Sequence, residues 1–296
     1  MGKKRKVKKG QKQSPPPSFF QIGSEGRSLL NKGFNAGWLN FSLRNKISDS
    51  IQGGGRYSTD GKEGRFVSDA QYKADKCVFV QTCDKDQNFS SEVIMMDPFD
   101  VKQATAKISL LYTPTKVREG KILSSFSFSH ANLRGEAFHA FDSIFTMPAL
   151  KLSAVFGNNN FHAGVQTLYS SQNSRVNSTE AKCQFTNKKF EVVASVNKKK
   201  SITASACYKV TPHLSVAFQS LMKSAKKYNK LSHTGGVRYK KGGCEVAARI
   251  NSDAQVGLMG SYQMSSCLKV SLCSLIEAVH FDEKSHKFGV GLEFSV

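Results

Sequence analysis

The chain ends in HKFGVGLEFSV, residues 286–296, and this stretch decides the class of fold. Read in steps of two, its apolar residues are Phe288, Val290, Leu292, Phe294 and Val296. The residues between them are small or polar. A period of two residues is typical of a β-strand that has one face in an apolar medium and the other in a polar one. The apolar medium can be the protein core or lipid.

The same alternation recurs along the chain from Trp38 onward. It is clear in WLNFSLRN (38–45), KFEVVASV (189–196), SITASACYKV (201–210) and EVAARINS (245–252). Short breaks such as NKKK, KKGG and NSDA separate these runs, and GGG at 53–55 is also predicted to be a turn. No helical period interrupts the series, so the sequence predicts an all-β meander.

The two faces of these strands select the environment. One face is aliphatic and aromatic, and the other carries Lys, Arg, Glu, Asn and Ser. About 258 residues, at roughly 13 per strand and turn, give about 20 strands. A soluble barrel of that size would expose an apolar exterior to water. The pattern therefore predicts a transmembrane up-and-down β-barrel, with lipid outside and water inside.

The composition limits the function classes. The formal net charge is +21, and the mean hydropathy is −0.36. Such a charge predicts a polyanionic partner, anionic lipid or a flux of small anions. The seven cysteines form no C-x-x-C motif, and the seven histidines are scattered. We therefore expect free thiols, no metal, no cofactor and no catalytic residue.

The N-terminal part is organised differently. Residues 1–18 are predicted to be a disordered polybasic tail. Its KKRKVKK run resembles a nuclear-localisation cluster, could bind anionic lipid, or is simply solvated. Residues 19–37 are predicted to form a short amphipathic helix and a glycine hinge, before a barrel over 38–296. The apolar face of this helix is Phe19, Ile22, Gly26, Leu29 and Leu30.

Three stretches carry a resemblance to a known family. They are QIGSEGRSLLNKGFNAGWLNFSL (21–43), AARINSDAQVGL (247–258) and HKFGVGLEF (286–294). Together with the helix and meander, they resemble the mitochondrial porins, the voltage-dependent anion channels. The resemblance covers about residues 19–296. It implies a barrel of 19 strands with the helix in or near the lumen, gating by voltage and insertion in the mitochondrial outer membrane.

Departures from the family pattern suggest a specialised paralogue. Ser24 replaces a usual lysine, and Gln21 and Ser28 replace acidic residues. Gly242 replaces an aspartate. The family often has a membrane-facing glutamate in the stretch that QYKADKCVFVQ (71–81) resembles. At the matching position this sequence has Lys76, with Asp75 next to it. The family ties that glutamate to hexokinase docking, so hexokinase binding is doubtful here.

Candidate site residues follow from strand parity and from the resemblance. If the helix lines the lumen, its bases face the permeation path together with bases of the barrel wall, and such rings of bases favour anions. Each base taken alone is better explained as a generic solvated residue than as a binding residue. The candidates for pore- or nucleotide-facing residues are Arg27, Lys32, Arg44, Lys189, Lys209 and Arg249.

Three further sets complete the candidate residues. Gly33 and Gly37 are a hinge, or alternatively a plain helix stop. By resemblance, a motif near the nucleotide site contains Asn251, Ser252, Gly257 and Leu258. Lys287, Gly289, Leu292 and Phe294 match a sorting signal for outer-membrane barrels, and the alternative is an ordinary last strand.

The sequence thus predicts a non-enzymatic channel for passive, voltage-gated diffusion of small solutes across the mitochondrial outer membrane. The expected partners are anionic metabolites (nucleotides, phosphate, chloride) and membrane lipid, with no nucleic acid. A homo-oligomer is left open. Two alternatives also stay open: a protein-translocase-type barrel of the same membrane, and a basic nuclear or nucleic-acid-binding β protein.

Overall fold

The computed structural model describes residues 15–85, 88–98, 103–112, 121–130, 132–141, 149–170, 173–198, 201–224, 229–279 and 286–296. The tail predicted over 1–18 lies outside these residues except for its last four. The described part contains one helix, α1 (Ser24–Asn31), and nineteen strands. The strands are β1 (Leu39–Lys46), β2 (Ile51–Thr59), β3 (Gly64–Lys73), β4 (Cys77–Asp84), β5 (Phe89–Met96), β6 (Ala104–Tyr112), β7 (Lys121–His130), β8 (Leu133–Phe141), β9 (Ala149–Gly157), β10 (Phe161–Ser170), β11 (Arg175–Thr186), β12 (Phe190–Asn197), β13 (Ile202–Lys209), β14 (Leu214–Ser224), β15 (Asn229–Lys241), β16 (Cys244–Asn251), β17 (Gln255–Gln263), β18 (Leu268–Glu277) and β19 (Lys287–Ser295).

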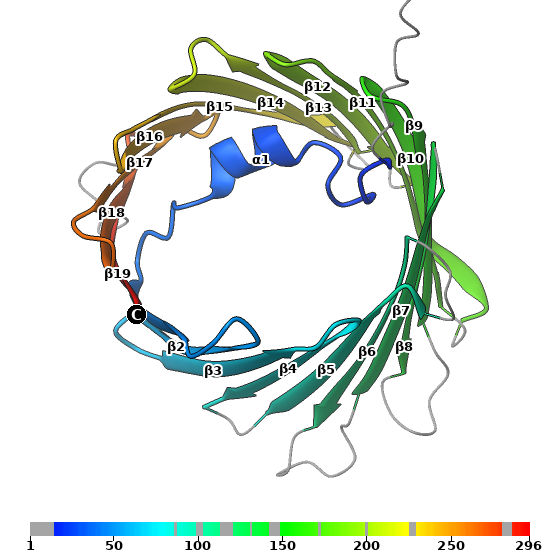
Figure 1. Cartoon of the computed structure of the whole chain (residues 1–296). Helices are drawn as coiled ribbons and strands as arrows, with labels where there is room; N and C mark the ends of the chain where they lie inside the picture. The colour runs from blue at the N-terminus through cyan, green and yellow to red at the C-terminus, as the bar shows by residue number, and fades with distance from the viewer. Residues whose placement is uncertain are drawn as a thin grey trace, which may run out of the picture.

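The strands close into a barrel (Figure 1). Each strand pairs antiparallel with the next, and β1 pairs with β19 in parallel, with Phe41 opposite Leu292. In a meander with an odd number of strands, the first and last strands run in the same direction, so the closing pair must be parallel. The 19 strands implied by the resemblance are confirmed.

The alternation places apolar side chains outside and polar ones inside. In β1, Leu39, Phe41 and Leu43 are exposed on the outer face, and the rings of Phe41 and Phe294 lie 5.4 Å apart across the seam. The inward positions of β1 are Asn40, Ser42 and Arg44, since Asn40 and Ser42 line a cavity inside the barrel. In the described strands, the registers place charged side chains on the inner face, apart from residues at strand ends. The predicted all-β class is confirmed.

The helix lies inside the ring of strands, against β13, β14 and β15 (Figure 1). All five residues predicted for its apolar face are buried: Phe19, Ile22, Gly26, Leu29 and Leu30. The regular helix begins only at Ser24, because Gly23 has a φ of 74°, in the left-handed region. Among the described residues, no helix has both the length and the apolar character needed to cross a membrane.

The structure contradicts the turn predicted at residues 53–55, and it places Lys76, which the resemblance aligned with a membrane-facing glutamate, outside the strands. Gly53, Gly54 and Gly55 lie within β2 and pair with β1 and β3 instead of forming a turn. Lys76 and Asp75 lie in the turn between β3 and β4, which the bond from Ala74 N to Cys77 O (2.8 Å) closes. Neither charge is therefore a lipid-facing strand residue. In both cases long-range pairing, which local residue types do not reveal, sets the strand boundaries.

Candidate functional site

The N-terminal end of α1 is held by an acid and an amide on the lumen wall. Glu191 in β12 accepts a hydrogen bond from Gly26 N through Oε1 (3.1 Å). Gln184 in β11 accepts one from Gly23 N (3.4 Å) and donates one to Glu191 Oε2 (2.9 Å). The first N–H groups of a helix have no partner within the helix and carry partial positive charge. A buried carboxylate is therefore a favourable partner at this end.

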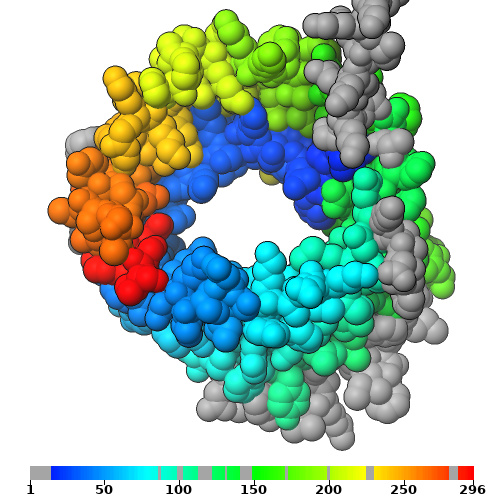
Figure 2. Space-filling model, in the orientation of Figure 1, coloured from blue at the N-terminus to red at the C-terminus, as the bar shows by residue number. Residues whose placement is uncertain are grey.

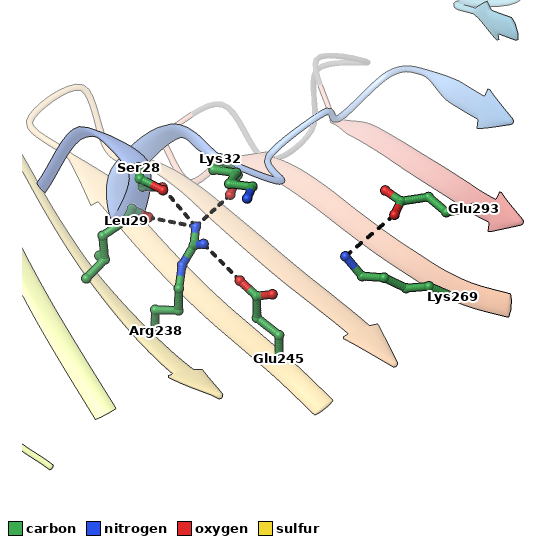
Figure 3. A network of polar contacts seen from close by, with 7 residues as sticks. All are labelled: Ser28, Leu29, Lys32, Arg238, Glu245, Lys269 and Glu293. Atoms are coloured by element: carbon green, nitrogen blue, oxygen red, sulfur yellow. Dashed lines mark hydrogen bonds and ion pairs between the residues drawn. The ribbon is translucent and has the colours of Figure 1, made fainter. Parts of the chain in front are cut away.

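The C-terminal end of α1 is held by Arg238 in β15 (Figure 3). Its Nη2 donates to the carbonyl oxygens of Ser28 (3.0 Å), Leu29 (3.2 Å) and Lys32 (2.6 Å). Its Nη1 donates to Glu245 Oε1 at 2.8 Å, which fixes the guanidinium on the wall. Carbonyls at a helix C-terminus lack helical donors and carry partial negative charge, so the guanidinium complements this end.

A second arginine extends this contact toward the linker that follows the helix. Arg249 in β16 donates to Leu30 O (2.9 Å) and to Asn31 Oδ1 (3.4 Å). Its guanidinium also lies 4.5 Å from the centre of the Phe34 ring, a cation–π contact. The two wall arginines and the wall glutamate thus match the polarity of the helix from end to end.

Apolar contacts complete the seat of the helix. Phe19 and Ile22 pack with Val155 and Val193 of the wall. A second buried cluster joins Leu29 and Leu30 to Cys207 and Ala217. These side chains are buried away from the water of the lumen. The helix thus adds an apolar core inside a barrel that otherwise has a polar interior.

Glycines in the wall make room for the side chains of the helix segment. A Cβ added at Gly236 would lie 2.8 Å from Leu30 Cδ2. One added at Gly164 would lie 3.0 Å from Phe19 Cδ2, and one at Gly257 would lie 3.1 Å from a ring carbon of Phe34. The wall is therefore shaped for this helix position.

Three of the six predicted pore bases hold structure together. Arg27 donates to its own segment, at Gly23 O (3.2 Å), Ile22 O (2.9 Å) and Phe20 O. Lys209 forms an ion pair with Glu25 of the helix at 2.8 Å. Arg249 binds the helix as described above. The inward positions of Lys209 and Arg249 agree with strand parity, but the hydrogen-bond donors of all three bases are engaged by the protein.

The other three predicted bases have different surroundings. Lys32 lines a cavity of about 250 Å³ between the linker and the wall, together with Arg56, Lys269 and Glu293. Arg44 lies at an inward position of β1. Lys189 lies in the turn between β11 and β12, so its predicted assignment to a strand is wrong. The strand begins one residue later than the alternation suggested.

The motif assigned by resemblance to a nucleotide site is divided by the structure. Asn251 Oδ1 accepts hydrogen bonds from the N–H groups of Asp253 (3.1 Å) and Gln255 (2.9 Å), and so organises the turn between β16 and β17. Ser252 bonds His233 in the neighbouring strand (2.8 Å, N to O). Gly257 faces inward beneath Phe34. Leu258 is 45% exposed on the outer face, so it does not face the lumen.

The predicted hinge glycines lie between α1 and β1. Gly33 and Gly37 have φ values of 91° and 88°, which other residues rarely adopt. At Gly33 a Cβ would also lie 2.8 Å from Met259 Cε. Both positions thus require glycine for the path of the chain, whether or not that path bends during gating.

The four sorting-signal residues lie in β19 on both of its faces. Lys287 and Gly289 pair with Leu275 and Cys273 at inward positions. Leu292 and Phe294 pair with outward residues of β1. The outer pair is thus placed toward the apolar medium, as the alternation predicts.

Sequence reasoning missed the residues that fix the helix. Glu191 and Gln184 hold its start, and Arg238 and Glu245 hold its end. Alternation did place Glu191 on an inward face. Its partnership with Gly26, which lies 165 positions earlier, follows only from closure of the barrel.

Ion pairs neutralise many of the carboxylates on the inner wall. They are Glu92–Lys107 (2.7 Å), Glu136–Arg134 (2.8 Å), Glu180–Lys182 (3.3 Å), Glu245–Arg238 (2.8 Å) and Glu293–Lys269 (3.9 Å). Arg44 and Arg56 have no carboxylate at ion-pairing distance among the described residues. Within those residues no group of three potential metal ligands occurs. The described inner wall therefore keeps a positive surplus.

Comparisons with known proteins agree with this architecture. The family model for eukaryotic porins matches residues 15–289. The voltage-dependent anion-selective channel of Drosophila melanogaster is 24% identical, with 94% of this chain and 98% of that protein covered. The non-selective voltage-gated ion channel VDAC2 of Homo sapiens is 22% identical, with 94% of each covered.

Solved structures show likeness of fold alone. A porin variant from Rhodopseudomonas blastica superposes with a TM-score of 0.55 at 12% identity, over 83% of this chain and 99% of that one. The closed barrel, the outward apolar face and the family match over nearly the whole chain lead to one conclusion. This chain belongs to the eukaryotic porin family and is a divergent, pore-forming β-barrel of an outer membrane.

Proposed function

We propose that this protein is a voltage-gated channel of the mitochondrial outer membrane for passive diffusion of small hydrophilic solutes, chiefly anions such as nucleotides, phosphate and chloride. It catalyses no reaction. The names of its relatives support voltage gating. The single observation that carries the proposal is a lumen that stays open beside the helix (Figure 2) and has surplus bases at inward positions of its wall.

The surplus bases lie on parts of the inner wall that the helix does not contact. Arg56 in β2 pairs across the strands with Ser42 of β1, on the inner face. Lys223 and Lys230 lie opposite each other on β14 and β15, at inward positions beyond the helix contacts. Like charges that lie close together on the inner face raise the local electrostatic potential and concentrate anions. The inner acids cannot cancel this field because most of them are already paired.

Gating in this proposal is release of the helix from its seat. Polar contacts hold both ends of the helix. When the helix leaves the wall, water can form hydrogen bonds with the same groups. The docked helix narrows one side of the lumen, and a detached helix would cross the permeation path. A membrane potential acts on this change through the charges carried by the helix.

Reversal potentials in planar bilayers under a KCl gradient test the proposed selectivity. The refolded protein is expected to prefer chloride, and Arg56→Glu is expected to reduce that preference. Ser58→Ala, an uncharged change at the next inward position of β2, is the matched control. A cation preference of the unmodified protein, or an Arg56→Glu variant with unchanged selectivity, would contradict the electrostatic argument.

A further inference from the structure

A sector of one barrel rim is basic and contains no acid. The turns that join β11 to β12, β13 to β14, and β15 to β16 lie next to one another on the same rim. Lys188, Lys189, His213, Lys240 and Lys241 are exposed there. Residues 186–190, 209–214 and 240–244 include no Asp or Glu. We name this set of five residues the basic rim.

The backbone holds these turns in fixed relation to one another. Lys209 N donates to Lys189 O (2.7 Å), which joins the first turn to β13. Lys240 N donates to His213 O (2.8 Å), and His213 Nδ1 lies 3.0 Å from Lys240 O. At a strand spacing of about 4.8 Å, the first and last turns lie roughly 19 Å apart. The basic rim is thus a preformed array and not a set of independent lysines.

Aromatic side chains lie on the outer face directly below the basic rim. Phe185, Tyr208 and Tyr239 are 42%, 45% and 41% exposed there. The rings of Phe185 and Phe190 are 5.6 Å apart, and the rings of His213 and Tyr239 are 6.4 Å apart. Aromatic girdles mark the level at which a membrane barrel leaves the hydrocarbon. The turn lysines above them and Lys241 therefore lie at the depth of lipid phosphates, whereas Lys240, opposite Glu245 at an inward position of β15, lies at the lumen edge of the rim.

The opposite part of the same rim differs. In the turn between β1 and β2, Asp49 forms an ion pair with Lys46 at 2.6 Å. Asp75 lies beside Lys76 in the turn between β3 and β4. The absence of acids is therefore a property of one sector.

From these observations we propose that the basic rim binds the headgroups of anionic phospholipids, and so anchors the β11–β16 wall in an anionic patch of membrane. The rim spans enough length for two or three neighbouring headgroups. A soluble acidic protein would match the charge of the basic rim equally well, but it would not explain the aromatic girdle just below the rim. This inference concerns the outside of the barrel and is independent of ion selectivity and gating.

Fluorescence quenching by brominated lipid tests the proposal on the refolded full chain. Tyr239→Trp reports on the basic rim, and Tyr72→Trp is the matched reporter on the opposite sector. Both tyrosines are exposed on the outer face near the end of their strands: Tyr239 lies two positions before the last residue of β15, and Tyr72 lies one position before the last residue of β3. The signal of Trp38, whose ring stacks with Arg65 at 5.2 Å, is measured in the parent and subtracted. Vesicles contain phosphatidylcholine and phosphatidylglycerol, with only one of the two brominated.

We expect enrichment of phosphatidylglycerol at the Tyr239 reporter over the Tyr72 reporter of at least roughly threefold. Each base near an anionic surface favours the anionic lipid by roughly fivefold when fully engaged, and partial engagement reduces this. Replacing Lys188, Lys189, Lys240 and Lys241 by Gln should remove the enrichment. Rising salt should weaken it in the reporters with an unmodified rim, a readout that does not depend on the folding of a lysine variant.

The control removes the same charge elsewhere, with Lys46, Lys62, Lys73 and Lys85 changed to Gln. These four lysines are exposed and lie outside the basic rim. Enrichment that survives in this control but not in the rim variant supports the proposal. The proposal would be overturned by equal quenching at the two reporters, or by an equal loss of phosphatidylglycerol enrichment in the two quadruple variants. A soluble acidic protein would then be the favoured partner of the basic rim.

Discussion

Arg238→Met is expected to weaken docking of the helix and to shift closure of the channel toward lower voltage. The arginine is the main polar anchor of the helix C-terminus, with three carbonyl acceptors and one carboxylate. Methionine keeps much of the side-chain volume but has no donor. The side chains of Arg238 and Glu245 are 14% and 17% exposed, so water replaces these bonds only partly in the docked state.

The expected size follows from the contacts. Hydrogen bonds that involve a charged group contribute about 1.5–3 kcal/mol net, and we take about 2 kcal/mol for this set because the three carbonyls share one Nη2 group. Residues 24–32 carry Glu25, Arg27 and Lys32, a net charge of +1. One charge that crosses the whole field gains about 2.3 kcal/mol per 100 mV. The closing midpoint should therefore move toward zero by about 90 mV, and by more if the helix crosses only part of the field.

Single-channel and multichannel recordings in planar bilayers measure this midpoint. Arg238→Lys keeps the charge but loses the fork of donors, so an intermediate shift is expected. Lys107→Met removes a lumen base that pairs with Glu92 on a wall outside the helix contacts, and it should leave the midpoint unchanged. An unchanged midpoint in Arg238→Met, at normal open conductance, would show that the helix stays docked during closure and would refute the proposed gate.

Two further predictions address the helix seat and the last strand. Gly236→Val forces Leu30 from its place and should cost about 1–3 kcal/mol of docking, whereas Gly235→Val, where an added Cβ has nothing within 4 Å, should not. Protease access to the helix segment in refolded protein distinguishes the two variants, and equal access would contradict the fitted seat. Replacing Leu292 and Phe294 together by Gln should block membrane assembly, measured by carbonate extraction, because amides would face lipid. A normally assembled double variant would end the sorting hypothesis.

The class of fold could be predicted from the sequence because it depends on local alternation. Phe41 and Phe294 each follow a period of two, and both face outward in the structure. The face of the helix was likewise predicted from spacing alone. The odd strand number could not be obtained in this way, because it is settled by the parallel pairing of β1 with β19, two segments at opposite ends of the chain.

The errors came from residues whose local preference differs from their place in the barrel. Three successive glycines favour a turn, yet Gly54 lies in β2, where it pairs with Arg44 of β1 and Asp69 of β3. Lys189 was assigned to a strand that begins only at Phe190. For the site, Arg238 differs in no local feature from other inward bases. Its role depends on a helix more than 200 positions away along the chain.

The charges of this lumen divide into two functions according to the wall on which they lie. On the β11–β16 wall, Glu191 faces the start of the helix and Arg238 and Arg249 face its end, so the wall accepts the helix in one direction only. A reversed helix would bring its carbonyls to the glutamate and its N–H groups to the arginines, both unfavourable. On the uncovered wall, Arg56 contacts no helix and has no carboxylate at ion-pairing distance within the described part of the chain. A guanidinium on the first wall therefore fixes the gate, whereas the same group on the second is left to attract the permeant anion.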